Sequence, residues 1–148
     1  MAQMQDLIRI ANTDINGNNG VFVGLTKIKG VNYSMANAIC KVFSFDKKTP
    51  IKDLGDENIK KIEEFLKNPL DFNIPTWMVN RRKDRETNED VHLITTDLKL
   101  ATEDDVKLLR KIKSYKGFRH EKKLPVRGQR TKSNFRRNKG KLARKIKR

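Results

Sequence analysis

The sequence has 148 residues, of which 36% are hydrophobic and 35% are charged, and its formal net charge at pH 7 is +16. A chain of this length and polarity builds one small core, so we expect part of it to become ordered only on a partner. It contains no apolar run of about 18 residues, its first residues lack the basic start and apolar stretch expected of a signal peptide, and its single cysteine cannot form an internal disulfide. These features argue against membrane association and predict a cytoplasmic protein.

The positive charge is concentrated at the C-terminal end of the chain. Residues 107–148 contain 19 lysines and arginines and one acid, Glu121, whereas residues 1–106 contain 15 basic and 17 acidic residues. Positive charge clustered in one segment is typical of proteins that bind nucleic acid. We therefore expect a polyanionic partner that is bound mainly by the last 42 residues.

Short elements and turns alternate at the start of the chain. Residues 7–10 are expected to form a short strand or an extended arm, and the asparagines and glycines of residues 16–20 form a turn. Val21, Leu25 and Ile28 recur at helical spacing. This spacing favours a first helix over residues 21–28, although Val21–Val23 would also fit a strand.

Two further amphipathic helices follow. Ser34 is a good N-cap for the second helix, and Gly30 and Asn32 tolerate the positive φ that a tight turn between two helices requires. Asp56 is expected to cap the third helix, which ends before Asn68-Pro69. The apolar faces predicted for these two helices are Met35, Ala38, Ile39, Val42 and Phe43, and then Ile59, Ile62, Phe65 and Leu66.

The sequence leaves the structure of residues 71–96 open, except that Trp77 is more often a core anchor than a platform for base stacking. A last helix is expected to start at Thr102, with the acidic residues 103–105 at its positive end and basic residues towards its negative end. Its predicted apolar face is Val106, Leu109 and Ile112. Beyond Lys116 the hydrophobic periodicity stops. The prediction is a mainly α fold, with a small helical bundle as a head (1–115) and an extended basic tail (116–148).

Two segments carry nucleic-acid chemistry. Residues 25–34 have the form of a helix-hairpin-helix element, whose loop amides would point at phosphate, although a glycine between helices is often only a turn. Residues 116–137 combine arginines with neutral hydrogen-bonding side chains, glycines for close backbone approach, and Phe118 and Phe135 for stacking. This composition favours one particular folded RNA surface over a generic basic tail.

Arg119-His120, Leu124-Pro125-Val126-Arg127-Gly128-Gln129-Arg130-Thr131 and Asn134 resemble the signature of the small-subunit ribosomal protein thirteen family. The order of the predicted helices also matches that family. Residues 74–84 resemble its archaeal and eukaryotic branch, whose eukaryotic members are called protein eighteen. One departure is Asn32, which stands where many members carry a second glycine.

This resemblance implies a helix-two-turns-helix element and a structural role in the head of the small ribosomal subunit. The implied partners are small-subunit rRNA, small-subunit protein nineteen, large-subunit protein five across an intersubunit bridge, and peptidyl-site tRNA. The residues expected to bind rRNA are Lys27, Lys29, Gly30, Asn32, Arg119, His120, Arg127, Gly128, Gln129, Arg130, Thr131, Asn134, Arg136 and Arg137. The tail residues expected near tRNA are Lys139, Lys141, Arg144, Lys145, Lys147 and Arg148.

Other functions find less support. His92, His120 and Cys40 are too few and too dispersed for a zinc site, so no metal or cofactor is expected. A DNA-repair glycosylase of the helix-two-turns-helix type would need a nucleophile and a four-cysteine finger, which one cysteine cannot supply. A generic nucleic-acid-coating protein would explain the charge but not the varied chemistry of residues 127–134.

Overall fold

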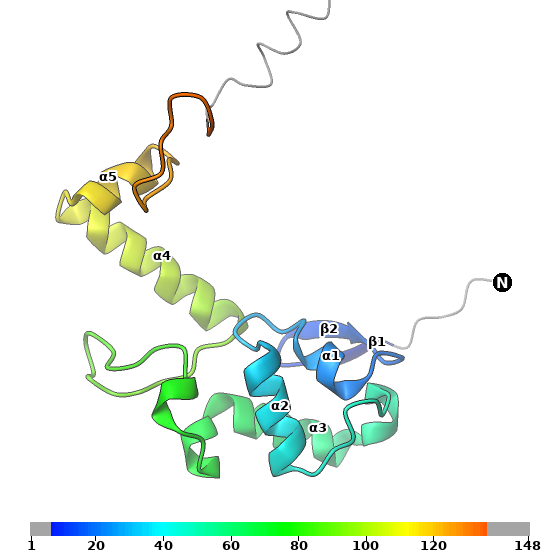
Figure 1. Ribbon diagram of the computed structural model, residues 1–148. Coiled ribbons are helices and arrows are strands. Elements are labelled where there is room, and N and C mark those ends of the chain that lie inside the picture. Colours follow the sequence, from blue (N-terminus) through cyan, green and yellow to red (C-terminus); the bar gives the residue numbers. More distant parts are fainter. Residues whose placement is uncertain (1–6, 136–148) are drawn as a thin grey trace, which may run out of the picture. The chain divides into compact units, whose positions relative to one another are not determined.

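The computed structural model describes residues 7–135 (Figure 1). The chain forms two compact units, Met1–Leu100 and Ala101–Arg148. The described part is mainly helical, as predicted, with one small sheet. No helix among residues 7–135 is long and apolar enough to cross a membrane. The division into a head and an RNA-binding tail after residue 115 concerns function and stays a prediction.

The first unit begins with a β-hairpin formed by β1 (Leu7–Ile10) and β2 (Thr13–Asn16). The turn between them consists of Ala11 and Asn12, both at positive φ, and the backbone N–H of Ala11 donates to Oε1 of Glu63 at 2.9 Å. Ile10 and Ile15 are buried in the core. Of the two alternatives expected for residues 7–10, a short strand or an extended arm, the structure shows the strand, and the turn expected at residue 16 begins only after β2.

Two helices follow the hairpin, α1 (Val21–Leu25) and α2 (Tyr33–Val42). The expected N-cap at Ser34 is wrong: Asn32 caps α2, because its side-chain oxygen accepts the backbone N–H of Tyr33 at 2.8 Å. Asn32 has φ −117°, so the positive φ expected there is also wrong, whereas Gly30 has φ +101°. The helix-two-turns-helix assignment stays a prediction.

The core of the first unit forms where α2 packs with α3 (Asp56–Lys67) and the 3-10 turn η1 (Ile51–Leu54). The apolar face predicted for α3 is confirmed by the buried Ile62, Phe65 and Leu66, with Ile59 partly buried, but Gly55 rather than Asp56 occupies the N-cap position. The face predicted for α2 is partly wrong, because Ala36 and Cys40 are buried while Val42 is 41% exposed.

Residues 69–94 form turns and a loop. The 3-10 turns η2 (Pro69–Phe72) and η3 (Thr76–Met78) lead to a pairing of Arg81 with Val91. Trp77 is 68% exposed, so its expected role as a core anchor is wrong; the neighbouring Val79 is buried in its place. His92 is the one buried ionisable side chain other than Cys40 among the residues described.

Two helices dominate the rest of the chain, α4 (Thr95–Lys111) and α5 (Tyr115–Glu121). The predicted start of α4 at Thr102 is wrong, so the acidic residues 103–105 lie inside the helix and not at its positive end. No residue of α4, which is described throughout, is buried, and Ile112 of its predicted apolar face is 62% exposed. Helix α5 occupies residues expected to be extended, whereas residues 122–135 contain no regular element.

Candidate nucleic-acid interface

The loop between α1 and α2 carries the exposed Lys27 and Lys29 and packs against the chain just before α4. The backbone carbonyl of Lys29 accepts the N–H of Thr95 at 2.8 Å. A Cβ atom on Gly30 would lie 2.6 Å from the carbonyl oxygen of Leu93. Packing inside the protein therefore accounts for this glycine, and Asn32 is used as a helix cap.

A hollow of about 330 Å³ brings Lys27 and Lys29 together with Lys99 of α4, and we call it the three-lysine hollow. Its other lining residues are Asn12, Thr13, Thr95 and Thr96, which come from the β-hairpin and the first turn of α4. Three ammonium groups beside neutral hydrogen-bonding side chains, with no acid in the lining, suit phosphate oxygens. The sequence pointed to Lys27 and Lys29 only, because the other residues are distant along the chain.

Helix α5 is fixed to the end of α4 by short contacts. Oγ of Ser114 accepts the N–H of Gly117 at 3.1 Å and donates to the carbonyl oxygen of Leu109 at 2.9 Å. A Cβ atom on the buried Gly117 would lie 2.1 Å from that same carbonyl oxygen. The sequence suggested that this glycine permits close approach to RNA, but it permits close approach of the two helices.

The half-buried Arg119 connects α5 to the segment that follows it. Its Nε donates to the carbonyl oxygen of Pro125 at 2.9 Å, and its guanidinium carbon lies 5.9 Å from the centroid of the Tyr115 ring. His120, next to it on α5, is also half-buried. The structure therefore gives Arg119 an intramolecular contact in addition to the RNA contact expected from the sequence.

The signature segment after Pro125 presents most of its side chains to solvent. Gly128 has φ +77° with open space around it, and Oε1 of Gln129 accepts the backbone N–H of Arg127 at 3.1 Å. Phe118 and Phe135 are exposed and accessible for stacking. The predicted site residues exposed here are Arg127, Gly128, Gln129, Arg130 and Asn134, whereas Thr131 is half-buried.

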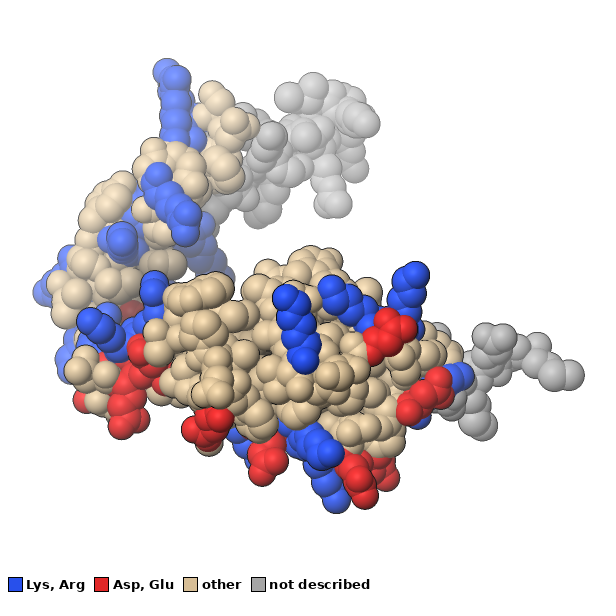
Figure 2. All heavy atoms as spheres, turned by 60° about the horizontal axis from the view of Figure 1, so that its bottom comes forward, with Lys and Arg blue, Asp and Glu red and all other residues tan. Residues whose placement is uncertain are grey.

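The two units differ in the charge on their surfaces. Figure 2 shows Lys and Arg side chains mixed with Asp and Glu over the first unit, whereas the described part around α5 is mainly blue and tan. The remaining predicted site residues lie outside the described residues: Arg136, Arg137, Lys139, Lys141, Arg144, Lys145, Lys147 and Arg148.

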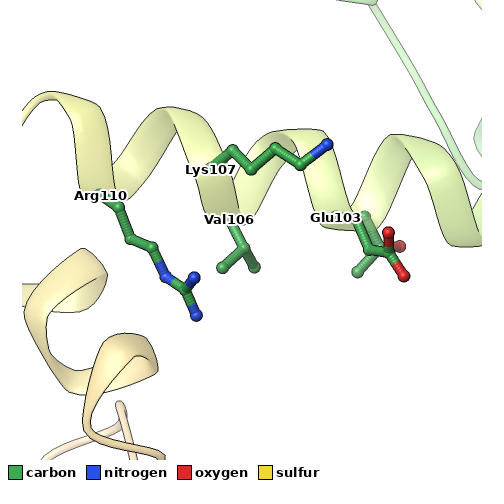
Figure 3. Close-up of a pocket in the computed structure, with 5 residues that line it drawn as sticks. Glu103, Val106, Lys107 and Arg110 are labelled. Atoms are coloured by element: carbon green, nitrogen blue, oxygen red, sulfur yellow. The ribbon is translucent and has the colours of Figure 1, made fainter.

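The surface of α4 has a second hollow, of about 320 Å³, lined by residues from Thr102 to Arg110. Figure 3 shows Val106 and Arg110 projecting from the same side of the helix, with Glu103 near one end of the hollow. Lys107 is paired with Asp104 at 2.8 Å, and this hydrogen bond raises the pKa of Lys107. Acidic and basic groups alternate here, so this hollow suits phosphate less well than the three-lysine hollow does.

Two buried ionisable groups, His92 and Cys40, lie in the first unit. Burial lowers the pKa of His92, whose ring nitrogens have no hydrogen-bond partner among the described residues. Cys40 is buried, which confirms the expectation that it is a small core residue, and this burial raises the pKa of its thiol. Within residues 7–135, no three His, Cys, Asp or Glu side chains are placed to hold a metal ion.

Comparisons with known proteins agree with the sequence signature. The model of the family "Ribosomal protein S13/S18" matches residues 9–137. The chain is 50% identical over 130 residues to the small ribosomal subunit protein uS13 of Methanobrevibacter smithii, covering 88% of each protein. It is 49% identical over 134 residues to the uS13 protein of Methanothermobacter thermautotrophicus, covering 90% of each, and 46% identical to that of Methanocaldococcus jannaschii, covering 92% of this chain and 91% of the relative. The chain therefore belongs to the ribosomal protein S13/S18 family.

Proposed function

We propose that the chain is a structural, non-catalytic component of the small ribosomal subunit that binds its rRNA mainly through residues 119–137. Membership of the S13/S18 family makes it a small-subunit ribosomal protein, located in the cytoplasm within the ribosome. The observation that carries the proposed binding mode is the exposed basic segment held behind α5 by the bond between Arg119 and Pro125. Because this hydrogen bond fixes the backbone at Pro125 relative to α5, it restricts where Arg127 and Arg130 can lie.

The chemistry of this segment suits a folded RNA. The guanidinium groups of Arg127 and Arg130 can each donate two hydrogen bonds to a phosphate or stack on a base. Gln129, Thr131 and Asn134 can recognise 2′-hydroxyl groups or base edges. Neutralising phosphates also releases counterions, so this binding contributes much of the affinity and weakens as salt rises.

The three-lysine hollow provides a second, smaller rRNA contact in the first unit. Lys27 and Lys29 are exposed in the loop between α1 and α2, and the bond from Thr95 to Lys29 holds that loop beside the start of α4. The three-lysine hollow is distant in sequence from Arg127, so the two sites would allow one protein to bind two parts of the RNA. Gly30 and Asn32 support this contact by shaping the loop.

The finer contacts follow from the family resemblance. The C-terminal residues Lys139, Lys141, Arg144, Lys145, Lys147 and Arg148 reach towards peptidyl-site tRNA, and the segment 139–148 contains no acid. The first unit contacts small-subunit protein nineteen and contributes to the bridge with large-subunit protein five. Photocrosslinkers placed at Lys147 and at Lys60 in ribosomes with bound tRNA test the tail contact, because only the first should crosslink to tRNA.

Binding of the full chain to purified small-subunit rRNA tests the main proposal. The double variant Arg127→Ala/Arg130→Ala should bind more weakly, and the slope of log affinity against log salt should become shallower by roughly 1.4–1.8 if two phosphate contacts are lost. The control Lys60→Ala/Lys61→Ala removes the same charge from exposed positions on α3. Equal losses in the two variants would contradict a specific site at Arg127 and Arg130.

A further inference from the structure

The 3-10 turn η3 carries an exposed tryptophan, and the loop after it carries the exposed cations Arg82 and Lys83. Trp77 is 68% exposed in a turn that is closed by a hydrogen bond from the N–H of Met78 to the carbonyl oxygen of Pro75, at 2.9 Å. Val79 is buried and Met78 packs against the core, so the turn itself is anchored to the first unit. An exposed tryptophan does not contribute the free energy of burial that it would in a core. Exposed aromatic surface of this kind often marks a binding site.

A hollow of about 620 Å³ opens next to this turn. Its lining residues are Thr76, Asn80, Arg82, Lys83 and Asp90. The side chains of Arg82 and Lys83 are exposed and have no hydrogen-bond or ion-pair partner among residues 7–135. Oδ1 of Asp90, the one acid of the lining, accepts the backbone N–H of Lys83 at 2.8 Å, which partly satisfies its charge.

The loop that carries these groups is braced at both ends. Arg81 and Val91 exchange two backbone hydrogen bonds, at 3.1 and 2.8 Å. The amide of Asn80 also bonds both the carbonyl oxygen and the N–H of Leu93, at 2.6 and 2.8 Å. The side chain of Asp84 accepts a hydrogen bond from Arg81, which lowers the pKa of its carboxyl, and the backbone carbonyl oxygen of Asp84 closes the tip of the loop by accepting the N–H of Asn88 at 2.8 Å. Because this geometry exists before binding, a ligand would lose little affinity to ordering the loop.

We propose that Trp77, Arg82 and Lys83 form a separate contact for an unpaired RNA nucleotide, in which Trp77 stacks on the base and the two cations bind its phosphates. This inference rests on the proposed rRNA-binding function but uses neither the tail nor the three-lysine hollow. An aromatic face beside cationic and neutral hydrogen-bonding groups is the chemistry that holds splayed-out bases. The residues that line the hollow are polar throughout, and Trp77 follows one of them, Thr76, in the chain. A tryptophan at the centre of a protein interface is instead surrounded by packed neighbours that exclude water.

The single tryptophan of the sequence makes the contact directly observable. Stacking on a base should quench the fluorescence of Trp77 and shield it from acrylamide when the full chain binds purified small-subunit rRNA, with binding followed separately by filter retention. The variant Arg82→Ala/Lys83→Ala should reduce the quenching, whereas Lys60→Ala/Lys61→Ala should not. Bound chain whose Trp77 stays bright and accessible would overturn this inference and leave the tail-mediated binding intact.

Affinity measurements on two variants distinguish aromatic stacking by Trp77 from apolar contact by a side chain of similar size. Trp77→Leu should weaken binding to the same rRNA roughly 5- to 150-fold, whereas Trp77→Phe, which retains an aromatic face, should lose much less. Thermal unfolding of both variants checks that the fold is unchanged, as the exposure of Trp77 predicts. Equal affinities for the wild type and Trp77→Leu would overturn the inference, as would shielding of Trp77 that appears only when other small-subunit proteins are added. Failure of the wild-type chain to bind rRNA at all would overturn the proposed function together with this inference.

Discussion

Arg119 donates from its Nε to the carbonyl oxygen of Pro125 at 2.9 Å, and this bond ties α5 to the segment that carries Arg127 and Arg130. Arg119 therefore acts as a positioning residue in addition to any contact it makes with RNA. Arg119→Lys keeps the positive charge but lacks the planar donor geometry that reaches this carbonyl. We expect its affinity for rRNA to fall roughly 2- to 12-fold, the worth of one hydrogen bond, with an unchanged salt dependence.

Hydrogen exchange of the full chain provides the structural readout for Arg119→Lys. The backbone amides of residues 126–130 should exchange faster in the variant, since their anchor to α5 is lost. The control Lys132→Arg alters an exposed basic residue in the same part of the chain and should leave both exchange and affinity unchanged. Unchanged exchange in Arg119→Lys would show that the bond to Pro125 does not position the segment.

Gly30 is required by the packing of the first unit. It has φ +101°, and an added Cβ would lie 2.6 Å from the carbonyl oxygen of Leu93, which belongs to the backbone and cannot rotate away. Gly30→Ala should lower the free energy of unfolding by more than about 2 kcal/mol, measured by urea denaturation. Gly128→Ala is the control, because Gly128 also has positive φ but nothing within 4 Å of the added Cβ. Its cost should be limited to the roughly 1–2 kcal/mol of placing a non-glycine residue at positive φ; equal losses in both variants would contradict a specific clash at Leu93.

His92 should make folding sensitive to mildly acidic pH. Burial lowers its pKa below the ordinary value of 6.5, so the unfolded chain takes up a proton that the folded chain resists. Above pH 6.5 the ring is neutral in both states and has no effect. Below pH 6.5, the free energy of unfolding should decrease as the pH is lowered, by at most about 1.4 kcal/mol per pH unit, until the pH reaches the pKa of His92 in the folded chain.

The comparison with His92→Leu isolates this effect. The variant should lose the part of the pH dependence that begins below about pH 6.5, because it has no imidazole at position 92 to take up a proton in the unfolded state. The contribution of Asp84, whose pKa is lowered from 3.8 by Arg81, is fully present above about pH 3.8 and is lost only at lower pH. Parallel curves of stability against pH in the two proteins would contradict the burial of an uncharged His92.

The parts of the fold that the sequence predicted are those with strong local patterns. The apolar face of α3 and the glycine turn before α2 follow from residue spacing and conformational preference. The hairpin was missed because its turn, Ala11-Asn12, lacks the glycine that usually occupies such positions. The start of α4 was missed because residues 95–101 have no buried face to produce a periodic pattern.

The candidate site shows the same division. Arg127, Arg130 and their neighbours could be recognised from composition and from a specific signature, and the structure places them on the surface. Lys99 and Thr13 could not, because only the folded chain brings them to the loop that carries Lys27. The exposure of Trp77 was also unpredictable, since a lone tryptophan beside apolar residues more often enters a core.

Sedimentation of a cell lysate through a sucrose gradient tests the central claim most directly, with this chain followed before and after a wash at roughly 0.5 M salt. The account predicts that the chain migrates with small ribosomal subunits and remains there after the wash, because several anchored contacts hold it to rRNA. A chain that sediments freely, or is stripped completely by the salt, would contradict a structural role in the subunit.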